Sequence, residues 1–105
     1  MKIKTSELTD ADLDWAVSQI EGKYKYYSID WYAAGPIIER EKIEWQFLPS
    51  SHKAHQYGAR KPSLGGLNRT FCMDGPTILV AAMRCYVASK LGNEVDIPEL
   101  TVSKS

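Results

Sequence analysis

The sequence predicts a small single domain of the α+β class, in which a short antiparallel sheet packs against two helices. Two segments with helical periodicity, residues 10–21 and 76–91, enclose a middle section that is rich in aromatic residues and alternates in polarity. The chain has 105 residues, and 44% of them are hydrophobic. A chain of this length can bury a hydrophobic core without disulfides or a metal ion, so we expect residues 1–105 to form one domain.

The N-terminal segment predicts an edge strand and then a helix. Residues 1–4 alternate apolar and basic side chains, which favours a strand. Thr9 is a residue type that caps helices, and aspartates occur at every second position after it, where the positive end of the helix dipole favours carboxylates. Apolar residues recur at helical spacing as far as Gly22, which provides a C-terminal stop. We interpret these acids as capping groups rather than as a metal site.

The middle of the chain predicts two strands followed by a long loop. Seven of the eleven aromatic residues lie between residues 24 and 48, and aromatic side chains favour strands. We expect strands at residues 24–29 and 37–47, separated by a turn at Ala34-Gly35-Pro36. Between residues 49 and 69 this pattern is lost, and recurring glycine and proline predict a loop. Long loops in small domains often carry function.

The C-terminal part contains the clearest helical signal. Residues 76–91 hold eleven apolar side chains among sixteen, with Pro76 at the first helical position and Gly92 just past the end. A helix that is apolar around most of its circumference is expected at the centre of the core, against a sheet. Residues 94–97 favour a short return strand, and residues 100–105 favour a frayed tail.

The net charge of zero hides an uneven distribution. Thirteen Lys and Arg balance thirteen Asp and Glu, which argues against a protein that coats nucleic acid or an anionic membrane, and against an acidic DNA mimic. Residues 1–22 nevertheless carry a net charge of −3, and residues 46–73 carry four bases and no acid. We therefore expect no bulk nucleic acid as a partner, although a local anionic partner is compatible with the basic segment.

The sequence predicts a cytoplasmic protein. It contains no apolar run that could serve as a signal peptide, and no stretch approaches the ~20 apolar residues of a membrane span. Cys72 and Cys85 would remain thiols in a reducing compartment. Cys85 lies in a strongly apolar segment, which is typical of a buried thiol.

No motif for catalysis or metal binding stands out. His52 and His55 have the spacing of a zinc site on a helix, but no third ligand lies nearby in the sequence. A Cys72 nucleophile with either histidine is a weak hypothesis, because such pairs occur by chance in most chains. The sequence also lacks a Gly-rich phosphate loop and a dinucleotide fingerprint. We therefore expect a protein that is not an enzyme and has no catalytic residue, metal or cofactor.

Arg84 and Thr77 are candidate binding residues of the C-terminal helix. Arg84 stands in the middle of an apolar segment, and a buried guanidinium requires a partner. Arg84 therefore pairs with a carboxylate, caps backbone carbonyls or lines a ligand pocket, unless it is simply exposed. The helix start at Gly75-Pro76-Thr77 presents free amide groups, which could hold a phosphate or a carboxylate.

A further candidate constellation combines aromatic and basic residues. Aromatic faces stack on bases and basic side chains hold phosphates, as a nucleotide or a single-stranded nucleic acid requires. The alternative is that the aromatic side chains fill the core and the basic loop is a solvated face. The residues concerned are Trp31, Tyr32, Trp45, Arg60, Lys61, Arg69 and the two histidines.

Three blocks of the sequence resemble the NinX-like proteins of lambdoid phages and prophages. The blocks read MKIKTSELTDADLDWAV, DWYAAGPIIEREKIEW and DGPTILVAAMRCYVASKLGNEVDIPEL, and they cover over half of the chain in the order of the family. The second block departs from the family by having Ala34-Gly35 where two glycines are typical. The resemblance implies a small phage accessory protein in the bacterial cytoplasm, with no established catalytic residues. The last block is also similar to small phage proteins with an α-β-α sandwich.

The phage setting and the aromatic and arginine residues favour a non-enzymatic binder that sequesters a small nucleotide-like ligand, such as a host immune signal. Such an anti-defence protein would bind its ligand with Trp31, Arg40, Trp45, Arg69, Thr77 and Arg84. The alternative is a protein-binding inhibitor or adaptor that docks on a host or phage enzyme through the acidic helix and the basic segment. A pocket formed between subunits would make the protein a symmetric homodimer.

Overall fold

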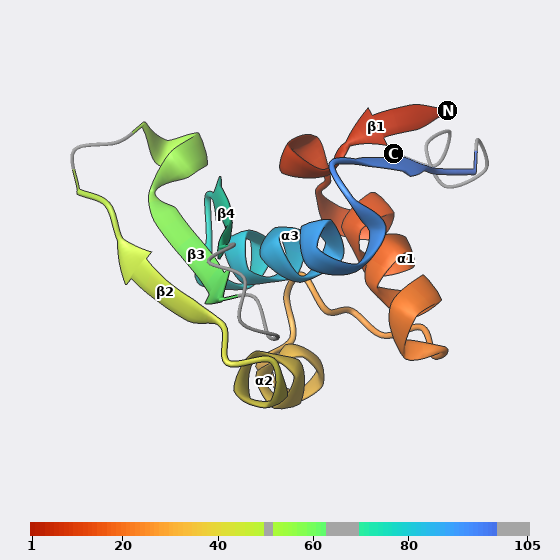
Figure 1. The fold of residues 1–105 in the computed structure, drawn as a ribbon, viewed down its shortest axis with the longest axis horizontal. Coiled ribbons are helices and arrows are strands. Elements are labelled where there is room, and N and C mark those ends of the chain that lie inside the picture. The colour runs from red at the N-terminus through yellow and green to blue at the C-terminus, as the bar shows by residue number, and fades with distance from the viewer. Residues whose placement is uncertain (50–51, 63–69, 99–105) are drawn as a thin grey trace.

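The computed structural model describes residues 1–49, 52–62 and 70–98 (Figure 1). Among these residues, three α-helices accompany five strands in two antiparallel sheets, which confirms the predicted α+β class. In chain order the elements are β1 (Lys2–Lys4), α1 (Asp10–Glu21), α2 (Trp31–Arg40), β2 (Glu44–Phe47), β3 (Tyr57–Pro62), β4 (Thr70–Gly75), α3 (Ile78–Leu91) and β5 (Glu94–Asp96). Two short 3-10 helices, η1 (Thr5–Glu7) and η2 (Lys53–His55), follow β1 and precede β3.

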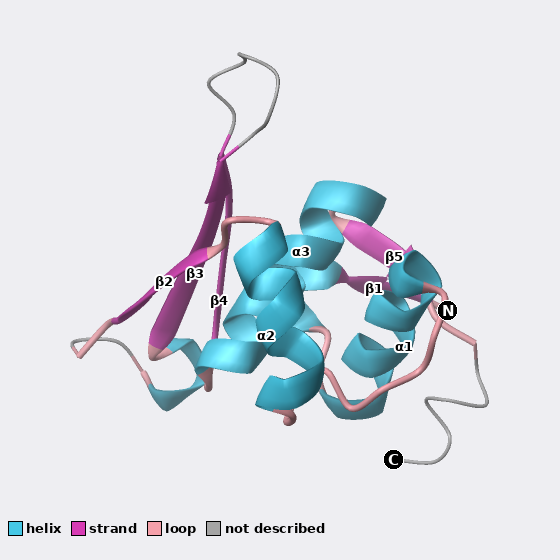
Figure 2. Cartoon of the chain, turned by 90° about the horizontal axis from the view of Figure 1, so that it is seen from below, coloured by secondary structure: helices cyan, strands magenta, loops and turns pink. Residues whose placement is uncertain are grey.

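Helix α3 occupies the centre of the molecule. All residues from Leu79 to Ala88 are buried, because α3 packs against β3 and β4 on one side and against α1 on the other (Figure 2). A helix that is apolar around most of its circumference can be covered on both sides in this way. The layers therefore differ from the α-β-α sandwich that the resemblance suggested, since a helix and not the sheet lies in the middle.

Strands β1 and β5 form a two-stranded antiparallel sheet, with Lys2 opposite Asp96. The amino group of Met1 donates a hydrogen bond to the Asp96 carboxylate at 3.0 Å. The positions of β1, α1 and β5 agree with the sequence predictions to within a residue. In the described part of the chain, no helix is both long enough and apolar enough to span a bilayer.

The three-stranded sheet, in the order β2-β3-β4, has one covered face and one open face. Trp45 pairs with Ala59, which pairs with Met73. Ala59 is buried and Met73 packs on the core, so this face lies against α3. Because side chains alternate along a strand, the opposite face presents the exposed side chains of Arg60 and Cys72.

Gly75 allows β4 to end directly against the first turn of α3. A Cβ atom at this position would lie 2.9 Å from Cγ1 of Val80 and 3.0 Å from the backbone nitrogen of Ala81. Any side chain would therefore push the end of β4 away from the start of α3.

Helix α2 stands where the sequence predicted a turn and the beginning of a strand. Residues 31–40 are helical although Gly35 and Pro36 lie inside the helix, and residues 24–29 form no strand. The aromatic residues of this section favoured strands, but the burial of one helical face outweighs local propensity. That face consists of Ala33, Ala34 and Ile37.

Asp30 is the N-cap of α2, and its carboxylate accepts a hydrogen bond from the Tyr32 N–H at 2.9 Å. We expect Asp30→Ala to lower the free energy of unfolding by about 1 kcal/mol, measured by urea denaturation. Thr9 at the start of α1 makes no such side-chain bond, so Thr9→Ala is the matched control and should cost about half as much or less. If both variants lowered the free energy of unfolding equally, the assignment of the Asp30 side chain as a stabilising N-cap would be wrong.

Strand β3 lies within the predicted loop at residues 49–69, β4 begins directly after that loop, and β2 covers only the end of the predicted strand 37–47. Glycine and the basic residues in β3 gave no strand signal, but Ala59 on α3 and the pairing with β4 hold it in place. Helix α3 begins two residues later than predicted, because the Thr77 hydroxyl caps it by accepting a hydrogen bond from Val80 N–H at 3.1 Å. Arg69 and the predicted tail at 100–105 lie outside the described residues.

Candidate ligand-binding site

A hollow of about 450 Å³ lies where the starts of α2, β3 and α3 meet. Trp31, the first residue of α2, and Thr77, the N-cap of α3, both line it, and so does Tyr57 at the start of β3. The Trp31 side chain is 49% exposed, so its ring is accessible to a ligand. Volumes of roughly 300 to 1,000 Å³ are typical of small-molecule sites, and this hollow falls within that range.

The start of α3 gives the hollow a polar wall. Thr77 uses its side chain to bind Val80 N–H, and its backbone carbonyl accepts a hydrogen bond from Ala81 N–H at 3.1 Å. Ile78 and Leu79 also line the hollow and belong to the first helical turn, where N–H groups have no acceptor within the helix. Together with the positive end of the helix dipole, these groups favour a negatively charged ligand.

The wall formed by Ser28 and Ile29 is fixed to α1 by a buried hydrogen bond. The Ser28 N–H donates to Oδ1 of Asp14 at 2.8 Å, and both side chains are buried. Burial raises the pKa of Asp14, and the hydrogen bond from the Ser28 N–H opposes this shift. Asp14 of α1 therefore holds the segment before α2 in place through Ser28.

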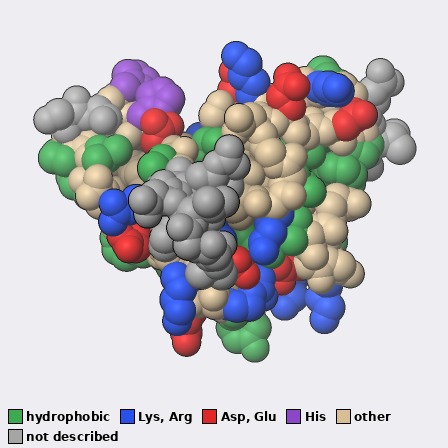
Figure 3. All heavy atoms as spheres, viewed as in Figure 1, with side chains coloured by type: hydrophobic (Ala, Val, Ile, Leu, Met, Phe, Trp, Pro, Cys, Tyr) green, Lys and Arg blue, Asp and Glu red, His purple; other side chains and the backbone are tan. Residues whose placement is uncertain are grey.

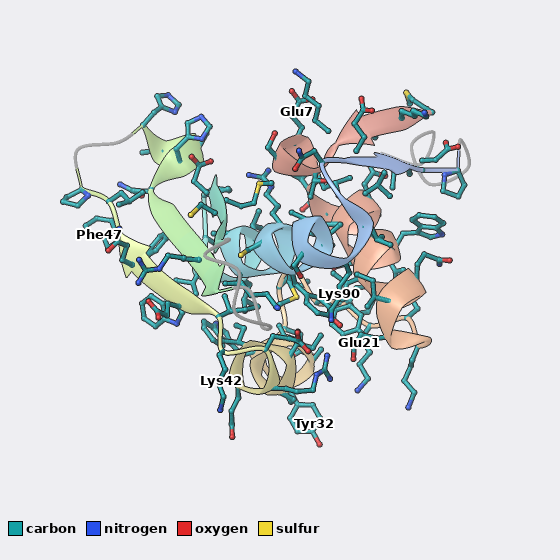
Figure 4. The ribbon with its side chains drawn as sticks, viewed as in Figure 1. Glu7, Glu21, Tyr32, Lys42, Phe47 and Lys90 are labelled. Atoms are coloured by element: carbon teal, nitrogen blue, oxygen red, sulfur yellow. The ribbon has the colours of Figure 1, made fainter. Side chains whose placement is uncertain are left out.

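Arg40 lies at the opposite end of α2, in a network of charged groups. Its guanidinium contacts Glu21 at 2.8 Å, Glu41 at 2.9 Å and the Tyr86 hydroxyl at 3.0 Å. Nζ of Lys90 joins this network 3.7 Å from Oε1 of Glu41, and Figure 4 shows Glu21 and Lys90 near the C-terminal end of α3. Burial raises the pKa of Glu21, but hydrogen bonds from Arg40 and Tyr86 outweigh it and bring the pKa below its ordinary value.

Arg84 caps backbone carbonyls, which is one of the alternatives that its sequence position left open. The side chain is only 5% exposed, and it donates from Nε to the Leu8 carbonyl at 2.8 Å and from Nη1 to the Asp74 carbonyl at 2.7 Å. Burial lowers the pKa of Arg84, and the negative charges of Asp74 and Glu7 oppose this shift. Arg84 does not line the hollow at the start of α3.

A second hollow, of about 490 Å³, lies beside the three-stranded sheet, and its lining includes Trp45 of β2 together with the open-face residues Arg60 and Cys72. Arg60 pairs there with Glu44 in an exposed ion pair. At the rim, Nδ1 of His55 contacts Oδ1 of Asp74 at 2.8 Å, and the histidines gather at one corner of the molecule in Figure 3. Among the described residues, no group of three or more His, Cys, Asp and Glu side chains could hold a metal ion.

Two of the six predicted binding residues, Trp31 and Thr77, therefore come together in one hollow. Arg40, Trp45 and Arg84 lie elsewhere, and Arg69 is outside the described residues. The structure adds Tyr57, which the sequence analysis missed because it fell within the expected loop. An aromatic residue in an otherwise polar loop was the available signal.

The fold and the hollow define a small α+β protein with a ligand-sized site between secondary-structure elements. The profile of the family described as Bacteriophage P22, NinX matches residues 27–90, which is more than half of the chain. The chain therefore belongs to the phage NinX family, as the sequence blocks indicated, and a role as a phage accessory protein is consistent with this membership. None of the curated proteins matches the chain.

Proposed function

We propose that this phage protein is a non-enzymatic binder that sequesters a small nucleotide-like ligand, such as a host immune signal, in the hollow at the start of α3. The observation that carries the proposal is the convergence of Trp31, Tyr57 and Thr77 on one hollow. Trp31 and Tyr57 supply aromatic surface on which a base can stack. The first turn of α3 supplies N–H groups for a phosphate.

The size and charge of the hollow narrow the ligand class. Among the described residues that line it, none is Lys or Arg, so a phosphate would be held there by backbone N–H groups and the dipole of a single helix. This arrangement suits one phosphate better than a chain of several. A nucleoside monophosphate or a cyclic nucleotide is therefore the preferred ligand class, and anti-defence by sequestration is the role that it would serve.

Isothermal titration with a panel of nucleoside monophosphates, cyclic mononucleotides, cyclic dinucleotides and ADP-ribose derivatives tests the proposal. We expect Trp31→Ala to weaken binding at least tenfold, because loss of one stacking contact is worth about 1 to 3 kcal/mol. Tyr32→Ala is the matched control, since Tyr32 is the next residue, is 86% exposed and does not line the hollow. The proposal would be wrong if every ligand of the panel bound more weakly than high micromolar. If Trp31→Ala and Tyr32→Ala lost equal affinity, the binding site would not be this hollow.

A second candidate function is a protein-binding inhibitor or adaptor. It is favoured by apolar side chains that the segment before α2 exposes to solvent, among them Tyr26 at 62% and Ile29 at 72%. Such side chains are common at protein interfaces. In affinity capture from host lysate, a specific partner should be lost with Tyr26→Ala and retained with Trp45→Ala, which changes a distant exposed aromatic residue.

A further inference from the structure

The outer edge of β2 is an unpaired strand edge. Strand β2 is the terminal strand in the order β2-β3-β4, and all four of its residues are exposed. In Figures 1 and 2 it lies at the outside of the molecule, and no strand of the described residues runs along its outer side. An exposed strand edge is a template for pairing with another strand.

The backbone shows which groups of this edge are free. The Leu48 N–H donates to the Gln56 carbonyl at 2.7 Å, so Leu48 directs its backbone groups toward β3. Successive residues of an antiparallel strand alternate in this direction. Trp45 and Phe47 therefore direct their N–H and C=O groups outward, whereas the Ile43 N–H is already bound to the Ile38 carbonyl at 3.0 Å.

The side chains of this edge lack the features that usually protect it. Trp45 and Phe47 share one face of the strand and are 48% and 51% exposed. Lysine and proline, which commonly block edges, are absent from β2. The one charged residue in the strand, Glu44, is neutralised within the same chain by Arg60, so two copies of this edge can approach without repulsion. The formal net charge of the whole chain is also zero.

We infer that β2 pairs antiparallel with β2 of a second copy of this chain, forming a symmetric dimer with a continuous six-stranded sheet. In this dimer Gln46 lies opposite Gln46 of the second copy, on the two-fold axis, and Trp45 of each copy lies opposite Phe47 of the other. Four aromatic side chains then meet on one face, and aromatic cross-strand pairs stabilise antiparallel sheets.

Other registers conflict with the observed contacts. A register with Trp45 on the axis needs the Ile43 N–H, which Ile38 already occupies. A register with Phe47 on the axis brings Trp45 opposite Pro49, which has no N–H to donate. A register with Glu44 on the axis places two carboxylates opposite each other. Because the paired segment is short, we expect a weak dimer that dissociates on dilution.

A cysteine on the predicted axis tests both the dimer and its register. Gln46→Cys is made in a Cys72→Ser background, because Cys72 is an exposed thiol. Residues opposite each other in a non-hydrogen-bonded pair have Cα atoms about 4.5 Å apart, which is within the range of a disulfide. We expect mild oxidation to give a covalent dimer at twice 11.8 kDa on non-reducing gels.

Glu44→Cys in the same background is the matched control. Glu44 would lie opposite Leu48 of the second copy, so the two introduced cysteines would be about 14 Å apart along the strands at ~3.4 Å per residue, too far for a disulfide. Equal crosslinking of the two variants, or none with Gln46→Cys, would overturn the inferred register.

The unlinked chain provides an independent readout by light scattering at increasing concentration. The wild type should shift from the mass of one chain toward that of two. Phe47→Pro removes the outward N–H and the Phe47 ring, whose centroid lies 5.4 Å from that of the Tyr57 ring, but it leaves the backbone bonds to β3. This variant should therefore remain monomeric while its far-UV circular dichroism stays unchanged. The proposal would be overturned if the wild type stayed monomeric at the highest concentration. It would also be overturned if the edge of β2 paired with a strand of another protein and not with a second copy of this chain.

Discussion

Replacing Arg84 by methionine should lower the free energy of unfolding by about 3 kcal/mol, measured by urea denaturation at neutral pH. The guanidinium donates to the buried carbonyl group of Leu8 and to the partly buried carbonyl group of Asp74. Methionine fills a similar volume but cannot donate, so both carbonyl groups lose their partner. A hydrogen bond from a charged donor contributes roughly 1.5 to 3 kcal/mol, and relief from burying the guanidinium offsets part of the loss.

The matched control for this variant is Arg60→Met. The Arg60 side chain is 60% exposed and, among the described residues, forms its ion pair with Glu44 at the surface, where ion pairs contribute ~1 kcal/mol or less. Arg84→Lys should fall between the two, because lysine keeps the charge but lacks the fork that reaches two acceptors. If Arg84→Met were as stable as the wild type, the cost of burying the Arg84 charge would equal the gain from its hydrogen bonds. The interpretation that Arg84 stabilises the fold would then be wrong.

Arg84 also connects parts of the chain that local sequence patterns cannot relate. It joins the middle of α3 to Leu8, which directly follows η1, and to Asp74 of β4. The sequence indicated that a buried arginine needs a partner. Every residue has a backbone carbonyl group, however, so the sequence does not show which carbonyl groups accept from Arg84. The choice among its alternatives therefore depended on tertiary structure.

Elements with their own end signals could be predicted from the sequence. Helix α1 ends at Gly22, which has a positive φ of 80°, and α3 ends at Gly92, with a φ of 91°. Both signals are local and act in any context. Helix α2 and the β3-β4 hairpin depend instead on what covers them. Ala34 is buried in a helix that also contains Gly35 and Pro36, and Ala59 is buried in a strand although alanine does not favour strands.

The candidate site was predictable only in part. Trp31 and Thr77 lie 46 positions apart in the sequence, and each was chosen for its chemistry alone. Their meeting depends on α2, which the sequence did not predict, and on Gly75, which brings β4 against α3. Arg40 was chosen as a ligand-binding residue for its charge, but its guanidinium forms ion pairs with Glu21 and Glu41 of the same chain.

Replacing Glu41 by glutamine should lower the free energy of unfolding by about 2 kcal/mol at pH 7. The Glu41 side chain is only 11% exposed, and it contacts Arg40 at 2.9 Å, Lys61 at 3.5 Å and Lys90 at 3.7 Å. Glu41 is the carboxylate partner of Lys61 among the described residues, and the Lys61 side chain is only 6% exposed. Glutamine keeps the shape but leaves a buried ammonium without a counter-charge, which is costly.

The matched control, Glu44→Gln, changes the same residue type in an ion pair with an exposed arginine. Both side chains of the Glu44 and Arg60 pair are about 60% exposed, so the loss should stay within ~0.5 kcal/mol. If Glu41→Gln and Glu44→Gln lowered the free energy of unfolding equally, the burial of an ion pair would not determine how much it stabilises this fold.

The cost of Glu41→Gln should also depend on pH. Burial raises the pKa of Glu41, but Arg40, Lys90 and Lys61 outweigh it, so the pKa in the folded state lies below the ordinary value of 4.5. A carboxyl with a lowered folded pKa stabilises the fold fully above its unfolded pKa, and this stabilisation is lost as the pH falls through the folded pKa. In urea denaturation across the acid range, the difference between wild type and Glu41→Gln should therefore be constant above about pH 6 and shrink steadily below about pH 4.5. A difference that did not change with pH would mean that Glu41 acts through its shape and not through its charge, because glutamine preserves the first and removes the second.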